Sequence, residues 1–188
     1  MIDNKSPDPI KPLTADSFAT FAGGCFWCLQ PPFDALPGVL ATEVGYMGGD
    51  IPHPTYEQVC GGKTGHAEVI RIRFNRELIS YRNLLDTFWR NIDPTMENGQ
   101  FYDRGTQYRT AIFWYDEEQR VEAQRSREAL AALDLFDSPI VTGLEKAGPF
   151  YPAEDYHQDY YQKCPLPYLR YKKGSGREAF LSRHWPSE

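Results

Sequence analysis

The sequence predicts an α+β domain in which helices pack against one sheet. Strand-like and helix-like stretches are intermixed along the chain but do not alternate strictly. The 188 residues are 41% hydrophobic and 24% charged, which is typical of a globular protein with a sizeable core. Because the sequence shows no repeat and no convincing linker, we expect a single domain over residues 17–188. Residues 1–16 are polar and proline-rich and are expected to form an N-terminal extension.

Charge and composition exclude several classes of protein. The net charge of -6 and the lack of a basic tract argue against nucleic-acid binding. No stretch is apolar and long enough to span a membrane, and the N-terminus lacks the apolar core of a signal peptide. Four cysteines are too few for a disulfide scaffold in a chain of this length. They favour a reducing, cytoplasmic setting with catalytic or redox-active thiols.

The expected strands are β-prone or alternating stretches bounded by turn-forming residues. They cover residues 17–22, 39–46, 66–75, 109–115 and 139–145. The stretch at residues 66–75 is the clearest, because Ile70, Ile72 and Phe74 alternate with two arginines. One face of this strand is therefore expected to lie on the core.

The expected helices are recognised by their caps and apolar faces. They cover residues 25–36, 80–92, 116–133 and 153–163, with one further turn near residues 56–60. Ser80 is an N-cap residue, and Asp116 opens a sequence that resembles a capping box. Pro31 and Pro32 fall inside the first helix, which is expected to kink or to split into two short turns. The tail from Cys164 onward shows little periodicity.

Cys25 is the strongest candidate for a reactive residue. It follows Gly23-Gly24 and opens the first expected helix, where free N–H groups and the helix dipole stabilise an anion. A thiol in such a position can have a pKa of about 3.5–7.5 instead of about 8.5, so we expect a nucleophilic thiolate. Cys28 lies one turn further on and could close a disulfide with it. The alternative is a pair of buried cysteines that pack as small hydrophobic residues.

Glu68 is the second candidate. Because side chains alternate along a strand, it shares a face with the apolar side chains of Ile70, Ile72 and Phe74. Removal from water raises the pKa of a carboxyl group, and an acid that is still protonated near neutral pH can act as a general acid. The alternative is a strand-end glutamate that reaches water or pairs with an arginine.

Five further side chains could surround the reacting group. Tyr56 and Tyr108 lie in or beside loops and can donate hydrogen bonds to an oxygen, although core packing is the commoner role of a tyrosine. Asp103 could orient a loop or a phenol, or could simply be a solvated loop acid. Phe26 and Trp27 could form an apolar wall for a small substrate group, or could pack into the core.

Other patterns carry less weight. His157 could serve as a base for a catalytic cysteine, but its helical, aromatic surroundings favour a structural role. Residues 61–64 read Gly-Gly-Lys-Thr, yet the first glycine of a phosphate loop is missing and a strand follows in place of a helix. A zinc site at Cys25 and Cys28 is weak, because a second close-spaced cysteine pair is missing.

Together these residues resemble the peptide methionine sulfoxide reductases of type A. The Gly24-Cys25-Phe26-Trp27-Cys28 stretch is similar to the family's highly specific signature. Further matching motifs stand in family order at residues 45–49, 54–56, 64–68, 103–108 and 156–158, so that the resemblance covers about residues 18–163. It implies a two-layer α/β sandwich with a mixed sheet, a ferredoxin-like core and a long, mostly irregular C-terminal coil.

The resemblance implies a role for each site residue. Cys25 would attack the sulfur of methionine sulfoxide, and Glu68 would protonate the departing oxygen. Tyr56 and Tyr108 would hold that oxygen by hydrogen bonds. Asp103 would act through water or the substrate backbone. The aromatic side chains that would hold the S-methyl group are Phe26 and Trp27.

The same resemblance implies the catalytic cycle. Cys25 becomes a sulfenic acid, a second thiol condenses with it to an intramolecular disulfide, and thioredoxin (or dithiothreitol in vitro) reduces the disulfide. The substrate would be the S epimer of methionine sulfoxide, free or within proteins, and the activity would repair oxidised proteins. We expect no bound cofactor, no metal, and a monomeric enzyme.

One departure from the family leaves the second thiol open. Many relatives carry resolving cysteines in a glycine-rich C-terminal tail, but here no cysteine follows Cys164. Cys28 and Cys164 remain as candidates, with Cys28 favoured, while Cys60 is expected to be structural. Two other functions also stay open at this point: a thioredoxin-like dithiol carrier built on Cys25 and Cys28, and a metal-binding module without enzymatic activity.

Overall fold

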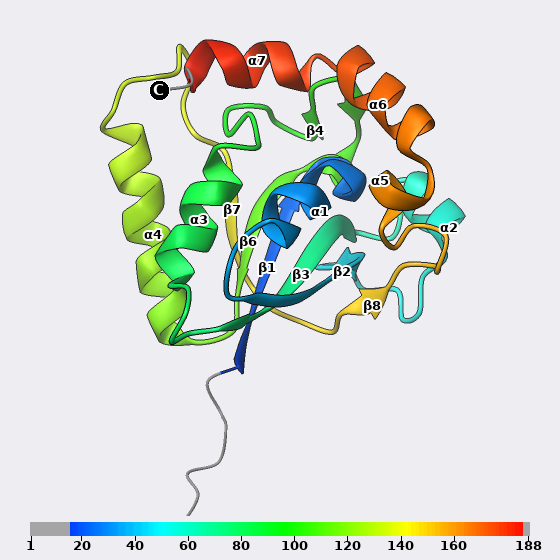
Figure 1. Ribbon diagram of the computed structural model, residues 1–188, viewed down its shortest axis with the longest axis horizontal. Coiled ribbons are helices and arrows are strands. Elements are labelled where there is room, and N and C mark those ends of the chain that lie inside the picture. The colour runs from blue at the N-terminus through cyan, green and yellow to red at the C-terminus, as the bar shows by residue number, and fades with distance from the viewer. Residues whose placement is uncertain (1–15, 186–188) are drawn as a thin grey trace, which may run out of the picture.

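The structure is a computed structural model that describes residues 16–185. The extension expected at residues 1–16 therefore lies outside the described part, except for Asp16, which opens the first strand. Six strands of this part form a sheet with the order β7-β6-β1-β3-β2-β8 (Figure 1). These strands are β1 (Asp16–Gly23), β2 (Val39–Met47), β3 (Ala67–Asn75), β6 (Thr110–Trp114), β7 (Gly143–Lys146) and β8 (Tyr151–Pro152). A small hairpin pairs β4 (Gly99–Gln100) with β5 (Asp103–Arg104).

The helices of the described part connect or flank these strands. They are α1 (Phe26–Asp34), α2 (Tyr56–Cys60), α3 (Tyr81–Trp89), α4 (Glu117–Ala131), α5 (Tyr160–Lys163), α6 (Pro165–Gly174) and α7 (Arg177–His184), with a 3₁₀ turn η1 (Thr106–Tyr108). The chain order β1-α1-β2-β3-α3-β6 and the antiparallel sheet order β6-β1-β3-β2 give a ferredoxin-like core. Because β7 joins β6 in parallel, the sheet is mixed, and the predicted α+β fold is confirmed.

The main core lies between the sheet and the layer of helices α1, α3 and α4. Its largest members come from alternate positions of β1 and β3 and from the inner faces of the helices. They include Phe21, Leu29, Phe33, Ile70, Ile72, Phe74, Leu84, Leu85 and Phe88. A smaller apolar cluster, which includes Met47, Val69 and Phe113, lies on the opposite face of the sheet under Phe150. Both faces of the central strands are therefore buried.

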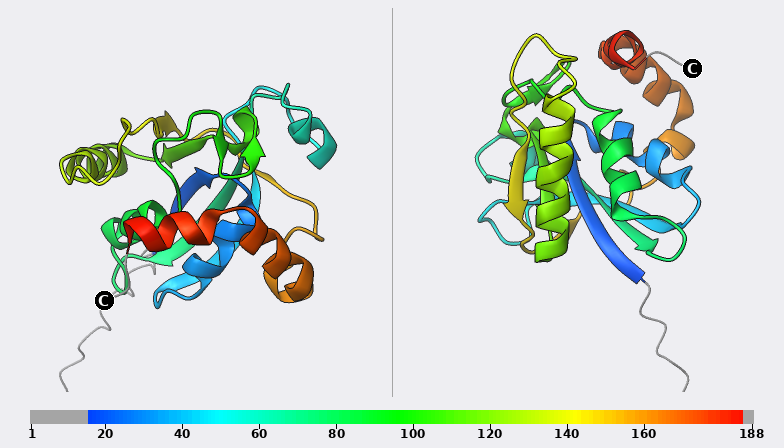
Figure 2. Two further views of the ribbon diagram at one scale, coloured as in Figure 1. Left: turned by 90° about the horizontal axis from the view of Figure 1, so that it is seen from above. Right: turned by 90° about the vertical axis from the view of Figure 1, so that its left-hand side faces the viewer.

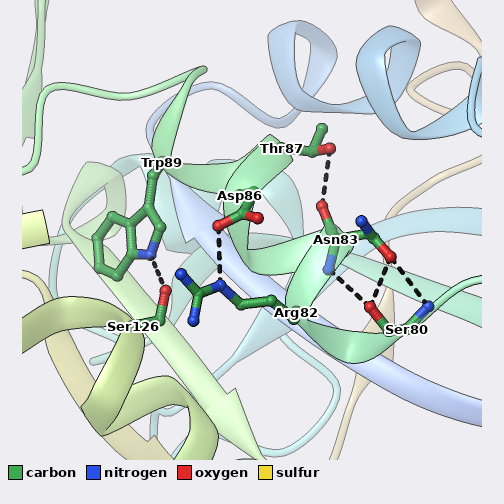
Figure 3. Close-up of polar contacts among 7 residues, drawn as sticks. All are labelled: Ser80, Arg82, Asn83, Asp86, Thr87, Trp89 and Ser126. Atoms are coloured by element: carbon green, nitrogen blue, oxygen red, sulfur yellow. Dashed lines mark hydrogen bonds and ion pairs between the residues drawn. The ribbon is translucent and has the colours of Figure 1, made fainter. Parts of the chain in front are cut away.

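Helix α3 shows how local sequence and long-range contact act together (Figure 3). Ser80 caps its N-terminus, because the Ser80 Oγ accepts from the Asn83 N–H at 3.1 Å and the Asn83 side chain accepts in return from the Ser80 N–H. This confirms the predicted cap. At the other end the Trp89 indole N–H donates to Ser126 Oγ of α4 at 2.7 Å. The cap starts α3, and the Trp89 indole fixes α3 against α4. The two helices lie side by side in Figure 2.

Helix α1 is continuous although Pro31 and Pro32 lie within it. The predicted split into two short turns is therefore absent. Proline removes an N–H donor from a helix, but α1 is only nine residues long and buries Leu29 and Phe33 in the core. Packing of these side chains holds the helix together where its hydrogen bonds are incomplete.

The C-terminal part corrects two sequence-based predictions. The expected helix at residues 153–163 is mostly turns, with only α5 at its end. The expected irregular coil beyond it is instead helical, in α6 and α7. Pro165 opens α6 at a position where a helix needs no N–H, and Gly176 (φ of 83°) turns the chain between the helices. The periodicity was weak because both helices bury few side chains. Figures 1 and 2 show them crossing the end of the molecule where α1 begins.

Candidate functional site

Cys25 stands at the N-cap position of α1, directly after the central strand β1. The preceding Gly24 has a φ of 79°, and a Cβ there would lie 2.4 Å from the Cβ of Gln100. Only glycine can make this turn without displacing the neighbouring hairpin. The turn delivers the Cys25 thiol to the end of the sheet, where the side chain is only 6% exposed.

Glu68 meets Cys25 at this end of the sheet. The residue lies on β3 opposite Tyr46 of β2, with its side chain on the face that α1 covers, and it is 2% exposed. Its Oε2 accepts a hydrogen bond of 3.1 Å from the backbone N–H of Phe26, the residue that follows Cys25. The structure therefore brings the two strongest sequence candidates into one buried site.

Burial raises the pKa of Glu68 to about 8. The hydrogen bond from Phe26 favours the carboxylate, but it offsets only part of the cost of removing a charge from water. Glu68 therefore carries a proton in most molecules at neutral pH. A neutral carboxylic acid beside a cysteine is the arrangement that general acid catalysis at a departing oxygen requires.

The direction of the pKa shift at Cys25 corrects the sequence-based prediction. Burial, a hydrogen bond with the Cys28 thiol and the charge of Glu68 raise the pKa of Cys25 well above its ordinary value. The first free N–H of α1, that of Phe26, is donated to Glu68 and not to the thiol. Desolvation of the thiolate therefore outweighs the helix N-terminus, and Cys25 is protonated in the resting protein.

Cys28 is the more acidic thiol of the pair. Its hydrogen bond with Cys25 lowers the pKa of Cys28 to about 7, and the positive charges of Arg177 and Lys172 act in the same direction. Cys28 also lies in the first turn of α1, where its backbone N–H donates to the Cys25 carbonyl at 3.1 Å. The two cysteines therefore lie in one turn of the chain.

Tyr56 and Tyr108 come together near Glu68. Both tyrosines act to lower the pKa of the Cys60 thiol against the larger effect of its burial, and the charge of Glu68 acts on both phenols. Tyr56 and Cys60 are the two ends of α2, four residues apart and hence on one face of the helix. Burial raises the pKa of both phenols, so they remain proton donors. Cys60, which the sequence analysis expected to be structural, lies beside these phenols.

Phe26 and Trp27 take different positions. Phe26 is fully buried in an apolar cluster beneath the site, together with Val44, Tyr46, Val59 and Ala153. Trp27 is half-buried and stacks on Tyr160 of α5 with ring centroids 3.9 Å apart. Of the two, Trp27 is the aromatic side chain that remains partly accessible beside Cys25.

His157 holds Trp27 in place. The Trp27 indole N–H donates to His157 Nδ1 at 3.1 Å, which leaves the histidine proton on Nε2. Burial lowers the pKa of His157, so the ring is neutral. With Nδ1 engaged in this way, the geometry supports the structural alternative for His157 over the role of base to a cysteine.

Glu154 is a site residue that no sequence motif indicated. Its Oε2 accepts from the Tyr46 hydroxyl at 2.9 Å, and its Oε1 accepts from the Tyr56 backbone N–H at 2.9 Å. The carboxyl group also lies 4.0 Å from His157 Nε2. Glu154 therefore ties the start of α2, and with it Tyr56, to the sheet. An isolated loop glutamate gives no local signal of such a role.

Asp103 is bound by a residue of the C-terminal helices. The Tyr171 hydroxyl of α6 donates to Asp103 Oδ2, and the same phenol acts to lower the pKa of Cys25 against the larger effect of burial. The Tyr171 ring stands edge-on to Trp27, with centroids 5.9 Å apart. Sequence reasoning missed Tyr171, because the tail was expected to be irregular.

Arg177 of α7 braces the turn before Cys25. Its guanidinium is 2% exposed, donates to the Gly23 carbonyl at 3.0 Å and also donates to the Asn91 carbonyl. It lies over the Phe101 ring at 4.7 Å. A fully buried arginine in a segment without periodicity could not be foreseen from the sequence.

Cys164 lies between α5 and α6. Its N–H donates to the Tyr160 carbonyl at 2.8 Å, and its carbonyl accepts from the Tyr168 N–H at 3.0 Å. The four cysteines of the chain all lie in the described part and are free thiols. Across residues 16–185, no group of three or more His, Cys, Asp or Glu side chains is placed to hold a metal ion. None of the helices in this range has the length and apolar character needed to cross a membrane.

Comparison with known proteins agrees with this site. The sequence profile of the peptide methionine sulfoxide reductases matches residues 17–188. The chain is 53% identical to the peptide methionine sulfoxide reductase MsrA of Bacillus licheniformis over 167 residues, which are 89% of this chain and 92% of that protein.

Solved structures show the same fold. The reduced form of Mxr1 from Saccharomyces cerevisiae is 35% identical with a TM-score of 0.75, covering 80% of this chain and 86% of that one. Mxr1 in complex with Trx2 matches at 24% identity with a TM-score of 0.55, covering 81% and 91% of the two chains. Fold, site and matches together define an oxidoreductase that acts on methionine sulfoxide. The chain belongs to the peptide methionine sulfoxide reductase family, and its relatives are of the MsrA type.

Proposed function

We propose that this enzyme reduces the S epimer of methionine sulfoxide, free or within proteins, with Cys25 as nucleophile and Glu68 as general acid. The observation that carries the proposal is the hydrogen bond between the Glu68 carboxyl group and the N–H of the residue after Cys25. It supports an arrangement in which sulfur attack and oxygen protonation occur at neighbouring atoms of one small substrate.

Tyr56 and Tyr108 hold the sulfoxide oxygen in this proposal. In the resting protein both phenols interact with the thiol of Cys60, which is a weak acceptor. A sulfoxide oxygen carries a large partial negative charge and accepts a hydrogen bond far better than a thiol does. The substrate oxygen therefore replaces Cys60 as the acceptor of hydrogen bonds from the two phenols. These two hydrogen bonds strengthen as negative charge develops on the oxygen. Trp27 contacts the S-methyl group, while Phe26 supports the site from below.

The chemical step is a two-electron transfer. The Cys25 thiolate gives an electron pair to the substrate sulfur, and the sulfur–oxygen bond of the substrate breaks. Glu68 gives its proton to that oxygen. The hydroxyl group then bonds to the Cys25 sulfur, and the bond between Cys25 and the substrate sulfur breaks with its electron pair on methionine, which leaves a sulfenic acid on Cys25. Glu68 is then a carboxylate and regains its proton from solvent before the next turnover.

Cys28 is the resolving thiol in our proposal. Its lowered pKa of about 7 means that a large share is thiolate at neutral pH, and it lies within one helical turn of Cys25. Attack on the sulfenic sulfur forms the Cys25–Cys28 disulfide and releases the oxygen as water. Cys164 is the second candidate, but the main-chain hydrogen bonds of two helices hold it at the α5–α6 junction.

Thioredoxin then reduces the disulfide, and dithiothreitol serves in vitro. The complex of the yeast relative Mxr1 with Trx2 supports this assignment. Four free thiols suit a reducing compartment, so we place the enzyme in the cytoplasm, where it acts as a monomer of one catalytic domain that repairs oxidised proteins. The enzyme needs no bound cofactor or metal for these steps.

The test supplies racemic methionine sulfoxide and dithiothreitol and follows methionine together with both sulfoxide epimers by chiral chromatography. We expect methionine to appear at the expense of the S epimer alone, and no methionine from Cys25→Ser. Consumption of the R epimer would overturn the assigned stereochemistry. Full activity of Cys25→Ser would remove the nucleophile. If the wild-type chain formed no methionine, the result would favour the alternative function of a thioredoxin-like dithiol carrier.

A further inference from the structure

Two long-range hydrogen bonds hold the short helix that carries Tyr56. Helix α2 is only five residues long and buries only Val59, and a helix of this length is not stable by itself in water. At its start the backbone N–H of Tyr56 donates to Glu154 Oε1 at 2.9 Å. At its end the Cys60 carbonyl accepts from the side-chain amide of Gln107 at 3.1 Å. The place of Tyr56 therefore depends on side chains from two distant segments.

Each of these two side chains belongs to another part of the site. The second oxygen of Glu154 accepts from the hydroxyl group of Tyr46 on β2 at 2.9 Å, so that Glu154 is anchored to the sheet. Gln107 lies in the 3₁₀ turn η1, directly before Tyr108. The two hydrogen bonds therefore join the helix that carries one phenol to the sheet and to the turn that carries the other phenol.

The Tyr56 ring lies close to the residues around Cys25. The ring of His157 packs against both Tyr56 and Phe26, with centroid distances of 4.4 Å and 5.1 Å. Phe26 directly follows Cys25 and donates its N–H to Glu68. A shift of α2 would therefore move the Tyr56 hydroxyl group relative to both proposed reacting groups.

Gln107 differs from the other buried glutamines of the described part. Gln30, Gln100 and Gln119 are each paired at the amide nitrogen and at the amide oxygen. Gln107 is 6% exposed, but its Oε1 has no hydrogen-bond partner among the described residues. Gly105 makes room for this amide at a φ of 126°, because a Cβ there would lie 2.3 Å from Oε1. An unpaired buried oxygen offsets the gain from the one hydrogen bond that Gln107 makes, so we expect little stability from this side chain.

We infer that Gln107 and Glu154 are positioning residues that hold the Tyr56 hydroxyl group at the place of the sulfoxide oxygen. The inference rests on the proposed function, in which Tyr56 and Tyr108 bind that oxygen. Gln107 and Glu154 act through the backbone of α2 and not through contact with the substrate. The physical reason is that a donor lowers the barrier only where it meets the developing negative charge, so a small displacement of α2 slows the reaction.

The test measures the rate of a single turnover without reductant, as methionine formed per chain, over a range of sulfoxide concentrations. Gln107→Met keeps the length of the side chain but removes the donor, and Glu154→Leu removes both acceptors. We expect each variant to slow the maximal rate by about fivefold or more, with the half-saturating concentration changed by less than about twofold. Glu154→Gln keeps an oxygen for the Tyr56 N–H and can donate to the Tyr46 oxygen, so it should retain at least about half of the wild-type rate.

Tyr56→Phe separates positioning from a general structural role. This variant lacks the hydroxyl group that has to be placed. Gln107→Met and Glu154→Leu should therefore each slow Tyr56→Phe by less than about twofold. A structural role would carry the full loss into this background, and such a result would overturn the inference. A wild-type rate for Gln107→Met or for Glu154→Leu would equally remove that residue from it.

A matched control is Gln119→Met. Gln119 is 2% exposed and donates to the Phe18 carbonyl at 2.8 Å, near the opposite end of β1 from Cys25. Its loss should lower the urea midpoint of unfolding and leave the turnover rate unchanged, whereas Gln107→Met should slow turnover with a smaller midpoint shift. A larger midpoint shift in Gln107→Met would contradict the inference. If the wild-type chain makes no methionine, or if Tyr56→Phe reacts as fast as the wild type, the proposed function fails first, which separates the two outcomes.

Discussion

The Glu68 carboxyl group accepts a hydrogen bond of 3.1 Å from the backbone N–H of Phe26. This contact joins the start of the central strand β3 to the first residue of α1, which directly follows Cys25. It also occupies the helix N–H that would otherwise stabilise a Cys25 thiolate. The same hydrogen bond thus positions the acid and helps to explain why the thiol is protonated at rest.

The first prediction concerns the acid itself. Glu68→Gln keeps the acceptor for the Phe26 N–H but removes the proton donor, so single-turnover sulfoxide reduction should slow by about a hundredfold or more. In the wild type the rate should fall as the pH rises through about 8, where Glu68 loses its proton, and the variant should lack this fall. Methionine formed per chain, measured across the pH range, provides the test.

A matched control for this variant is Glu43→Gln. Glu43 lies on β2 and forms a partly exposed ion pair with Arg71 at 2.5 Å, away from Cys25. Its replacement should leave the rate and its pH dependence unchanged. An unaltered rate in Glu68→Gln would exclude Glu68 as the acid.

The second prediction is that the same substitution stabilises the fold at alkaline pH. The pKa of Glu68 is about 8 in the folded protein against an ordinary value of 4.5, so the folded state holds this proton more tightly than the unfolded chain. Stability from this group is therefore complete below the unfolded pKa and is lost as the pH rises through the folded pKa. By linkage the loss is at most about 5 kcal/mol.

Urea unfolding under reducing conditions tests this at about pH 6 and about pH 9. The glutamine in Glu68→Gln cannot ionise. The free energy of unfolding of this variant, relative to that of the wild type, should therefore be higher at about pH 9 than at about pH 6. The same difference for Glu43→Gln should not change with pH. Equal pH dependence in Glu68→Gln and the wild type would mean that Glu68 ionises normally in the fold.

The third prediction identifies the resolving thiol. Cys28→Ser should still form one equivalent of methionine but should accumulate the Cys25 sulfenic acid, because the adjacent thiol is gone. Multiple turnover with thioredoxin should fall by about tenfold or more. Trapping of the sulfenic acid with dimedone, followed by peptide mass spectrometry, measures the accumulation. Cys164→Ser serves as the comparison and should still form the Cys25–Cys28 disulfide; a disulfide between Cys25 and Cys164 in the wild type would reverse the assignment.

The fourth prediction concerns the buried arginine of α7. Arg177→Ala removes hydrogen bonds to the Gly23 and Asn91 carbonyls and leaves a space under the turn before Cys25, so the free energy of unfolding should fall by about 2–4 kcal/mol. The pKa of Cys28 should rise, because the guanidinium helps to lower it. Arg183 is exposed on the same helix, and Arg183→Ala should change stability by no more than about 0.5 kcal/mol.

Urea unfolding and the pH dependence of Cys28 alkylation measure the two effects of Arg177. A stable Arg177→Ala variant would show that the turn before Cys25 holds without the C-terminal helices. Unchanged alkylation of Cys28 would show that another group sets its acidity.

The sequence by itself determined the four central strands of the sheet, the Gly-Gly-Cys turn and the buried acid of this protein. Alternation along residues 66–75 placed Glu68 on the apolar face, and the Ser80 cap started α3 as predicted. Such features depend on residues that are close together in the sequence, so that a local sequence pattern is enough to predict them. Only the tertiary structure decided the protonation of Cys25, because that depends on how completely the folded chain excludes water from the thiol. It also decided the parts played by Tyr171 and Arg177. Arg177 and Gly23 are 154 positions apart, and contacts across such a separation leave no periodic trace in a chain whose tail helices are mostly exposed.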